Sequence, residues 1–141
     1  MLGAEQQSGA LKKATDVFLE YKEQAGGPID TDRAVGLCNE IFSASEGAKD
    51  LNLRLFGIRF VNHIFELSEL FPRRDQVSAY GWSGLKDLFL RDPSDPDTVL
   101  AYALYHLNTG DRDRAKQLLC RLSRSALRHR DLAIKILDSL D

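Results

Sequence analysis

Apolar residues along the chain recur at helical spacing, and glycine, proline or short polar runs separate these stretches. No stretch alternates polar and apolar residues for long enough to predict a strand. The pattern therefore predicts an all-α protein of about seven helices. We expect these helices at residues 10–25, 31–42, 49–71, 75–90, 97–108, 112–126 and 131–140.

The ends of several helices are marked by capping residues and prolines. Asp30 or Thr31 can cap the second helix, and Ser94 or Asp95 can cap the fifth, with Pro96 in its first position. Pro72 should end the third helix, because proline disfavours helical geometry in the residue before it. The second helix should bury five residues that share one stripe, namely Ala34, Leu37, Cys38, Ile41 and Phe42.

The third and fifth helices are the most apolar, so we expect both to be buried, and the third to be covered on more than one side. Connections of two to six residues favour antiparallel packing of consecutive helices. With 141 residues the chain is in the size range of one domain, which we expect to span residues 1–141 with a disordered tail at 1–9.

The segment 96–127 resembles one tetratricopeptide unit, a helical hairpin of about 34 residues with small residues where its helices cross. The positions that match are Val99, Tyr102, Ala103, His106, Gly110, Asp111, Ala115 and Leu119. Leu127 departs from the pattern, because proline is expected there. One period earlier, Gly81, Leu85, Leu88 and Pro93 match, but Ser68, Glu69 and Pro72 do not.

This resemblance implies antiparallel helical hairpins stacked as a short right-handed array. A HEAT-like fold or an irregular α-bundle is the alternative. In tetratricopeptide arrays the first helix of each unit lines a concave groove. The resemblance places four residues on that surface: Leu100, Leu104, Leu107 and Asn108. An apolar groove fits the apolar face of a helix, which could be the chain's own C-terminal segment or a helix of a partner.

Basic residues are concentrated between residues 112 and 130, where seven Lys or Arg stand against one acid, Asp113. Arg114, Arg121 and Arg128 recur every seven residues with Arg124 between them, so we expect all four along one side of the sixth helix. This strip could be a solvated face, or it could bind an acidic partner surface or the acidic half of a second copy. Nucleic acid is disfavoured, because the net charge is −2 and no aromatic residue lies among the arginines.

The candidates for chemistry are sparse. His63, His106 and His129 lie on different predicted helices without metal-ligand spacing, and we expect them to be buried and hydrogen-bonded rather than catalytic. Cys38 and Cys120 are far apart, which is typical of reduced thiols in the cytoplasm. The N-terminus shows no secretory signal, and no apolar run could cross a membrane. We therefore expect no enzyme activity, cofactor or metal.

The leading hypothesis is a non-enzymatic protein–protein interaction module, an adaptor or chaperone that holds an apolar segment of a partner. The chain is similar in size and character to bacterial type III secretion chaperones, which are small tetratricopeptide-like proteins. The expected binding residues are the four on the groove and the four arginines. There are two alternatives: a nucleic-acid-associated regulator that uses residues 112–130, and a structural domain of a larger protein.

Overall fold

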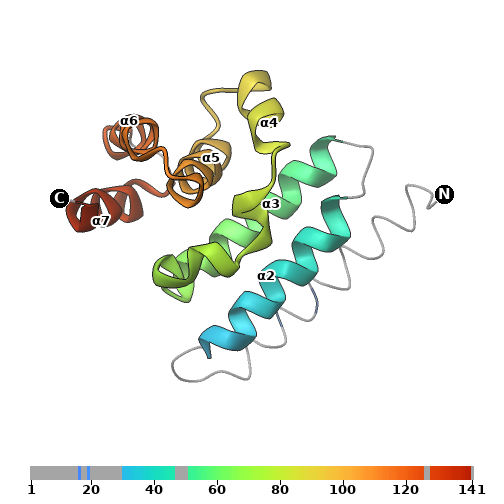
Figure 1. Cartoon of the computed structure of the whole chain (residues 1–141). Coiled ribbons are helices and arrows are strands. Elements are labelled where there is room, and N and C mark those ends of the chain that lie inside the picture. The colour runs from blue at the N-terminus through green and yellow to red at the C-terminus, as the bar shows by residue number, and fades with distance from the viewer. Residues whose placement is uncertain (1–15, 17–18, 20–29, 47–50, 126–127, 141) are drawn as a thin grey trace. The chain divides into compact units, whose positions relative to one another are not determined.

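The computed structural model describes residues 16, 19, 30–46, 51–125 and 128–140 (Figure 1). Within these residues the protein is helical and has no strand, which confirms the all-α prediction. The chain divides into two compact units, Met1–Leu70 and Phe71–Asp141, and each is described by itself. The expectation of one domain stays a prediction. The predicted tail at 1–9 and all but two residues of the predicted helix 10–25 lie outside the described residues.

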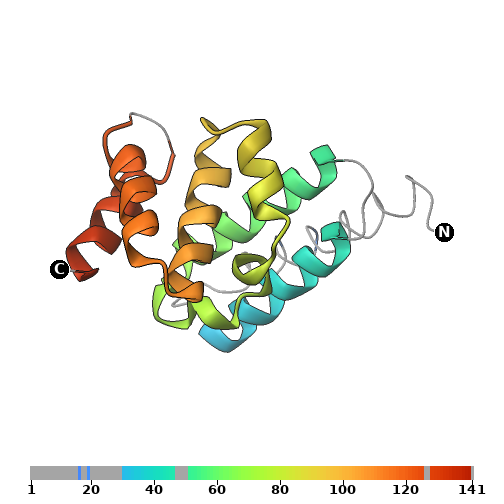
Figure 2. The same ribbon diagram turned by 45° about the horizontal axis from the view of Figure 1, so that its top comes forward.

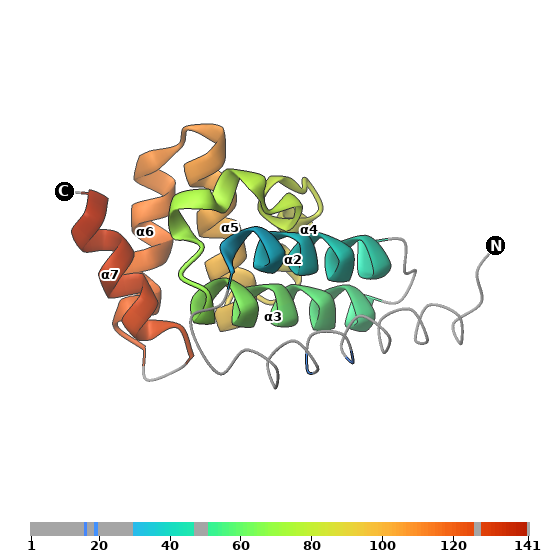
Figure 3. The ribbon, with the colours of Figure 1, turned by 90° about the horizontal axis from the view of Figure 1, so that it is seen from below.

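The first unit contains the helices α2 (Thr31–Glu46) and α3 (Leu51–Leu67), which run antiparallel beside each other (Figures 1 and 3). Asp30 begins α2 as predicted: its Oδ1 accepts a hydrogen bond from the amide of Asp32 at 3.0 Å. The predicted apolar stripe of α2 is confirmed as buried, with Ala34, Leu37, Cys38, Ile41 and Phe42 all below one-tenth exposure.

The two helices of this hairpin approach each other closely where Gly57 of α3 meets Ser45 of α2. A Cβ atom built on Gly57 would collide with both side-chain heavy atoms of Ser45. The Ser45 hydroxyl itself is buried and donates to the carbonyl of Phe42 at 3.0 Å. Farther along, the Cys38 thiol lies 3.8 Å from the carbonyl of Val61. Glycine is thus required at this crossing for space.

The helix α3 ends at Leu67, four residues before the predicted end at Phe71. The amide of Leu70 donates to the carbonyl of Phe65 at 3.1 Å, and Glu69 has a left-handed φ of 51°. This is the Schellman arrangement, in which one left-handed residue closes a helix and an apolar residue folds back on it. Leu70 and Phe65 are both fully buried, so we attribute the early ending to the burial of Leu70.

The second unit begins with two 3₁₀ helices, η1 (Phe71–Gln76) and η2 (Ser78–Gly81), followed by α4 (Leu85–Arg91). The prediction of one helix over residues 75–90 is therefore wrong. Val77 and Trp82 have extended backbones, which interrupt the helical path on both sides of η2. The Trp82 ring lies against Gly84, where a side chain would collide with it. Amphipathic spacing alone does not reveal these interruptions.

The remaining helices are α5 (Pro96–Thr109), α6 (Arg112–Ser123) and α7 (Arg130–Leu140), and consecutive helices pack against each other (Figure 2). The predicted start of α5 is confirmed: Asp95 Oδ2 accepts from the amide of Thr98 at 3.0 Å, with Pro96 in the first position. The end of α5 repeats the Schellman arrangement with Gly110 at φ 91°. Ala103 and Ala115 are fully buried.

We predict opposite effects for two glycine-to-alanine substitutions in the α2–α3 hairpin. Gly36→Ala should stabilise the protein by up to about 1 kcal/mol, because an exposed helical glycine with open space around it gains helix propensity. Gly57→Ala should destabilise it by about 1–2 kcal/mol, because the new methyl group collides with Ser45. Urea unfolding followed by circular dichroism measures both. Ser45→Gly should restore part of the loss, and a Gly57→Ala protein as stable as the wild type would contradict the close crossing.

Candidate functional site

The four residues expected to line an apolar groove lie on α5, and most of their surface is covered. Leu100 and Leu104 are fully buried, whereas Leu107 and Asn108 are half-buried. The Asn108 amide donates to the carbonyl of Arg74 at 3.2 Å and of Tyr80 at 3.4 Å, which ties α5 to both 3₁₀ helices. A partner could reach the two leucines only if the structure opened, so binding through this face stays a prediction.

The four predicted arginines do not share one helix. Arg114 and Arg121 lie on α6 and Arg124 caps its end, but α6 stops at Ser123 and Arg128 lies beyond it. The hydroxyls of Ser123 and Ser125 each donate at 2.8 Å to the carbonyl three residues before them, so these serines bond the last-turn carbonyls locally. The prediction that Arg128 belongs to the strip on helix six is therefore wrong.

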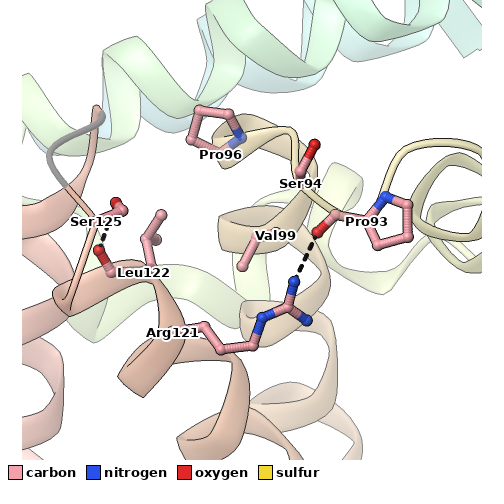
Figure 4. A pocket seen from close by; sticks show the side chains of 7 residues that line it. All are labelled: Pro93, Ser94, Pro96, Val99, Arg121, Leu122 and Ser125. Carbon is pink, nitrogen blue, oxygen red and sulfur yellow. Dashed lines mark hydrogen bonds between the residues drawn. The ribbon is translucent and has the colours of Figure 1, made fainter.

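Arg121 lies in the last turn of α6 and reaches across to the turn before α5. Its Nη2 atom donates to the carbonyl of Pro93 at 3.0 Å (Figure 4). Arg114 behaves differently. Its Nη1 atom donates to Oε1 of Gln117 at 3.3 Å, and its Cζ atom lies 5.7 Å from the centroid of the Phe89 ring. Among the described residues the Arg124 side chain makes no hydrogen bond or ion pair, and it is exposed. Arg121 and Arg124 are therefore both exposed at the end of α6, and among the described residues the bond from Arg121 to Pro93 is the one hydrogen bond that their side chains make.

A pocket of about 170 Å³ lies beside Arg121 (Figure 4). It is formed by the turn before α5, the first turn of α5 and the end of α6. The seven residues that line it are Pro93, Ser94, Pro96, Val99, Arg121, Leu122 and Ser125. Sequence reasoning missed this pocket. The available signals were the two prolines of the turn and Arg121, but the contact joins positions 28 residues apart.

The turn that forms one wall of the pocket is held by two aspartates. Asp92 Oδ1 accepts from the amide of Ser94 at 3.2 Å and from its hydroxyl at 2.7 Å. Asp95 Oδ2 accepts from the amide of Thr98 and, at 2.8 Å, from its hydroxyl. Because each proline also has a fixed φ angle, this wall has little conformational freedom to lose on binding.

The carboxylate of Asp97 lies next to this turn and is almost completely buried. His129 Nε2 is 2.7 Å from Asp97 Oδ1, and Arg128 Nη2 is 3.0 Å from Asp97 Oδ2. A carboxylate only accepts hydrogen bonds, so the imidazole donates. The Arg128 contact is an ion pair outside hydrogen-bonding orientation. His129 adopts a left-handed φ of 71°, a conformation uncommon outside glycine, which this contact helps to hold.

Of the three histidines, only His129 is confirmed as buried and hydrogen-bonded. His63 is exposed, so the expectation that it is buried is wrong. His106 is half-buried against the rings of Tyr102 and Tyr105, with centroids 4.4 and 5.5 Å away. Its Nε2 atom is buried without a hydrogen-bond partner in the described structure. We therefore assign His106 a packing role within an aromatic cluster.

Burial lowers the pKa of His106 from its ordinary value of 6.5. The carboxylate of Asp111, 3.9 Å from Nδ1, opposes this shift in pKa, and the nearby charge of Arg114 adds to it. Burial also raises the pKa of the Cys38 thiol to about 12, so Cys38 is not a nucleophile in the folded protein. In the described part of the chain no group of His, Cys, Asp or Glu could hold a metal ion.

We predict that removing the Asp97 carboxylate destabilises the second unit strongly. Asp97→Ala should cost about 3–5 kcal/mol, because it leaves a buried imidazole without its acceptor and Arg128 without its counter-ion. Asp113→Ala is the matched control, since Asp113 is also acidic in a first helical turn but exposed, and it should cost less than about 1 kcal/mol. Fluorescence of Trp82, the chain's one tryptophan, reports the unfolding. Equal losses for both variants would contradict the role of the buried contact.

We also predict that His106 makes the protein less stable as the pH falls. Below about pH 6.5 the unfolded chain binds a proton at this histidine, whereas the folded state, with its lowered pKa, binds it only at a lower pH. The free energy of unfolding should therefore fall between pH 7.5 and pH 5.5 more steeply in the wild type than in His106→Gln. Urea unfolding at both pH values measures this difference. An equal fall in the free energy of unfolding in the wild type and in His106→Gln would contradict the lowered pKa of His106.

No helix in the described part of the chain is long and apolar enough to cross a membrane. The chain matches no family model, and comparisons with curated proteins and with solved structures likewise give no match.

Proposed function

We propose that this chain is a non-enzymatic protein–protein interaction module that binds an acidic segment of a partner protein through Arg121 and Arg124. One observation carries the proposal. Among the described residues, the Arg121 side chain makes a single hydrogen bond and that of Arg124 makes none, so most of their guanidinium donors face solvent. A guanidinium has five N–H donors, and carboxylates are its best-matched acceptors.

The charge distribution supports an acidic partner. The chain carries 19 basic and 21 acidic residues, but seven of the basic ones fall between residues 112 and 130. Such a local excess in an otherwise acidic chain steers an oppositely charged surface toward this side of the second unit. A long polyanion has less to gain here, because its affinity grows with the number of phosphates that the protein neutralises.

We further propose that α5 and α6 form a tetratricopeptide-like hairpin within an adaptor or chaperone. The burial of Ala103 and Ala115, the left-handed Gly110 and the packing of α5, α6 and α7 in chain order support this arrangement. Both cysteines are free thiols, which fits a reducing compartment such as the cytoplasm. The type of adaptor depends on which partner it binds.

We predict that charge reversal at the end of α6 abolishes partner capture. The wild type, Arg121→Glu/Arg124→Glu and Arg112→Glu are immobilised, exposed to nuclease-treated native lysate, and compared by quantitative mass spectrometry. Arg112 is exposed at the other end of α6, so Arg112→Glu is a control for charge reversal on the same helix. Specific proteins should be retained by the wild type and Arg112→Glu, and reduced on the order of tenfold by the double variant.

Two outcomes would contradict the proposal. If the three immobilised proteins retain the same set, Arg121 and Arg124 do not determine partner binding. If a parallel capture from untreated lysate retains proteins that are absent after nuclease treatment, the arginines bind nucleic acid, and the alternative regulator function replaces the one proposed. Circular dichroism of each variant verifies that it is folded, since Arg121→Glu also removes the hydrogen bond to Pro93.

A further inference from the structure

The pocket beside Arg121 has the size and lining of a site for one apolar side chain. Its volume is about 170 Å³, close to that of a dry cavity of about 150 Å³ that accepts benzene. Two prolines, Val99 and Leu122 supply apolar carbon atoms, and two serines and Arg121 complete the lining (Figure 4). A leucine or phenylalanine side chain that enters it exchanges water for apolar contact.

The pocket is already formed without a ligand. The Arg121 guanidinium holds the end of α6 to the turn through the carbonyl of Pro93. Asp92 and Asp95 fix the same turn through their bonds to Ser94 and Thr98. Binding therefore orders few protein groups, and a larger share of the apolar contact energy remains as affinity.

The charges around the pocket select what accompanies that side chain. Arg121 forms part of the wall, Arg124 follows it three residues later, and Arg91 is exposed two residues before Pro93. Asp97 nearby is paired with Arg128 and His129. Asp92 and Asp95 accept bonds within the turn and keep their negative charge, but the three arginines outnumber these two carboxylates. The electrostatic environment at the entrance thus favours a carboxylate.

We propose that this pocket binds a short segment of a partner protein in which one leucine or phenylalanine is flanked by Asp or Glu. The apolar side chain enters between Val99 and Leu122, and the neighbouring carboxylates accept hydrogen bonds from Arg121 and Arg124. This inference rests on the proposed function and specifies its ligand. Specificity comes from the requirement for both parts, because an acid alone leaves the pocket empty and an apolar residue alone leaves the arginines unmatched.

Fluorescence anisotropy with three labelled peptides tests the inference on the full chain. The first is Gly-Glu-Asp-Leu-Asp-Glu-Gly, the second replaces its leucine by alanine, and the third replaces its acids by the corresponding amides. Only the first should bind tightly, and each replacement should weaken binding at least tenfold. Backbone amide shifts in ¹⁵N spectra should change at Val99, Leu122 and Ser125.

Variants of the protein locate the binding. Val99→Phe and Ser125→Phe each place a ring at the pocket. Both should weaken binding of the leucine peptide at least tenfold and leave binding of the alanine peptide unchanged. Because two separate positions are blocked, misfolding of one variant does not decide the result. Arg112→Glu should bind all peptides as the wild type does.

Other results would contradict the pocket, the proposed function or the proposed ligand. If the leucine and alanine peptides bind equally well, the pocket inference fails but the basic surface stands. If none of the acidic peptides binds and the capture experiment is also negative, the proposed function fails as well. If oligo(dT) displaces the leucine peptide at equal concentration, the site is a general anion site. If sedimentation shows self-association that Val99→Phe abolishes, the occupant is a second copy, and the inference is wrong.

Discussion

The buried carboxylate of Asp97 is the constraint on which the arrangement of the second unit depends. A charge with about 1% exposure is costly unless it is paired and hydrogen-bonded. Its partners, Arg128 and His129, come from a segment 31 and 32 positions later in the chain. Satisfying Asp97 therefore brings the chain after α6 back to the first turn of α5. The position of Asp97 in that turn is itself favourable, since the helix dipole stabilises a negative charge there.

This constraint also determines where the pocket can form. The loop from α6 to α7 is held at His129, immediately before α7 begins at Arg130. The end of α6 is consequently held near the start of α5, where Arg121 reaches Pro93. The pocket residues Leu122 and Ser125 lie between these two attachments. The binding surface that we propose thus includes the end of α6 and Ser125, with Arg121 held to the turn before α5 and His129 held to the first turn of α5.

The predictions that depended on local chemistry were the accurate ones. The cap at Asp95 with Pro96 and the apolar stripe of α2 follow from adjacent residues, and both were predicted from the sequence. The helix over residues 75–90 was wrong because the extended backbone at Val77 and Trp82 outweighs amphipathic spacing. The helix through Phe71 was wrong because left-handed glutamate is not expected, although burial of Leu70 stabilises it here.

The candidate site was predicted only in part, for a related reason. Helical spacing correctly placed Arg114 and Arg121 on α6, but it extended the strip to Arg128 because no glycine or proline follows Ser123 to mark the end of the helix. The Asp97–His129 contact, the pocket and the hydrogen bond from Arg121 to Pro93 each join residues that are distant in sequence. A single sequence does not show which residues that lie far apart along the chain come into contact. Local propensity therefore identified the basic residues but not the surface that they form.

The double role of Arg121 favours a protein ligand over a nucleic acid. One N–H group bonds the wall of the pocket, which restrains the orientation of the planar guanidinium. An immobilised guanidinium loses little entropy when a carboxylate meets it in register, and its planar geometry suits bidentate contact. The apolar pocket beside it contributes only if the ligand carries a side chain that fits. A phosphate backbone offers no such side chain, which is why we propose a peptide that carries both an apolar side chain and a carboxylate.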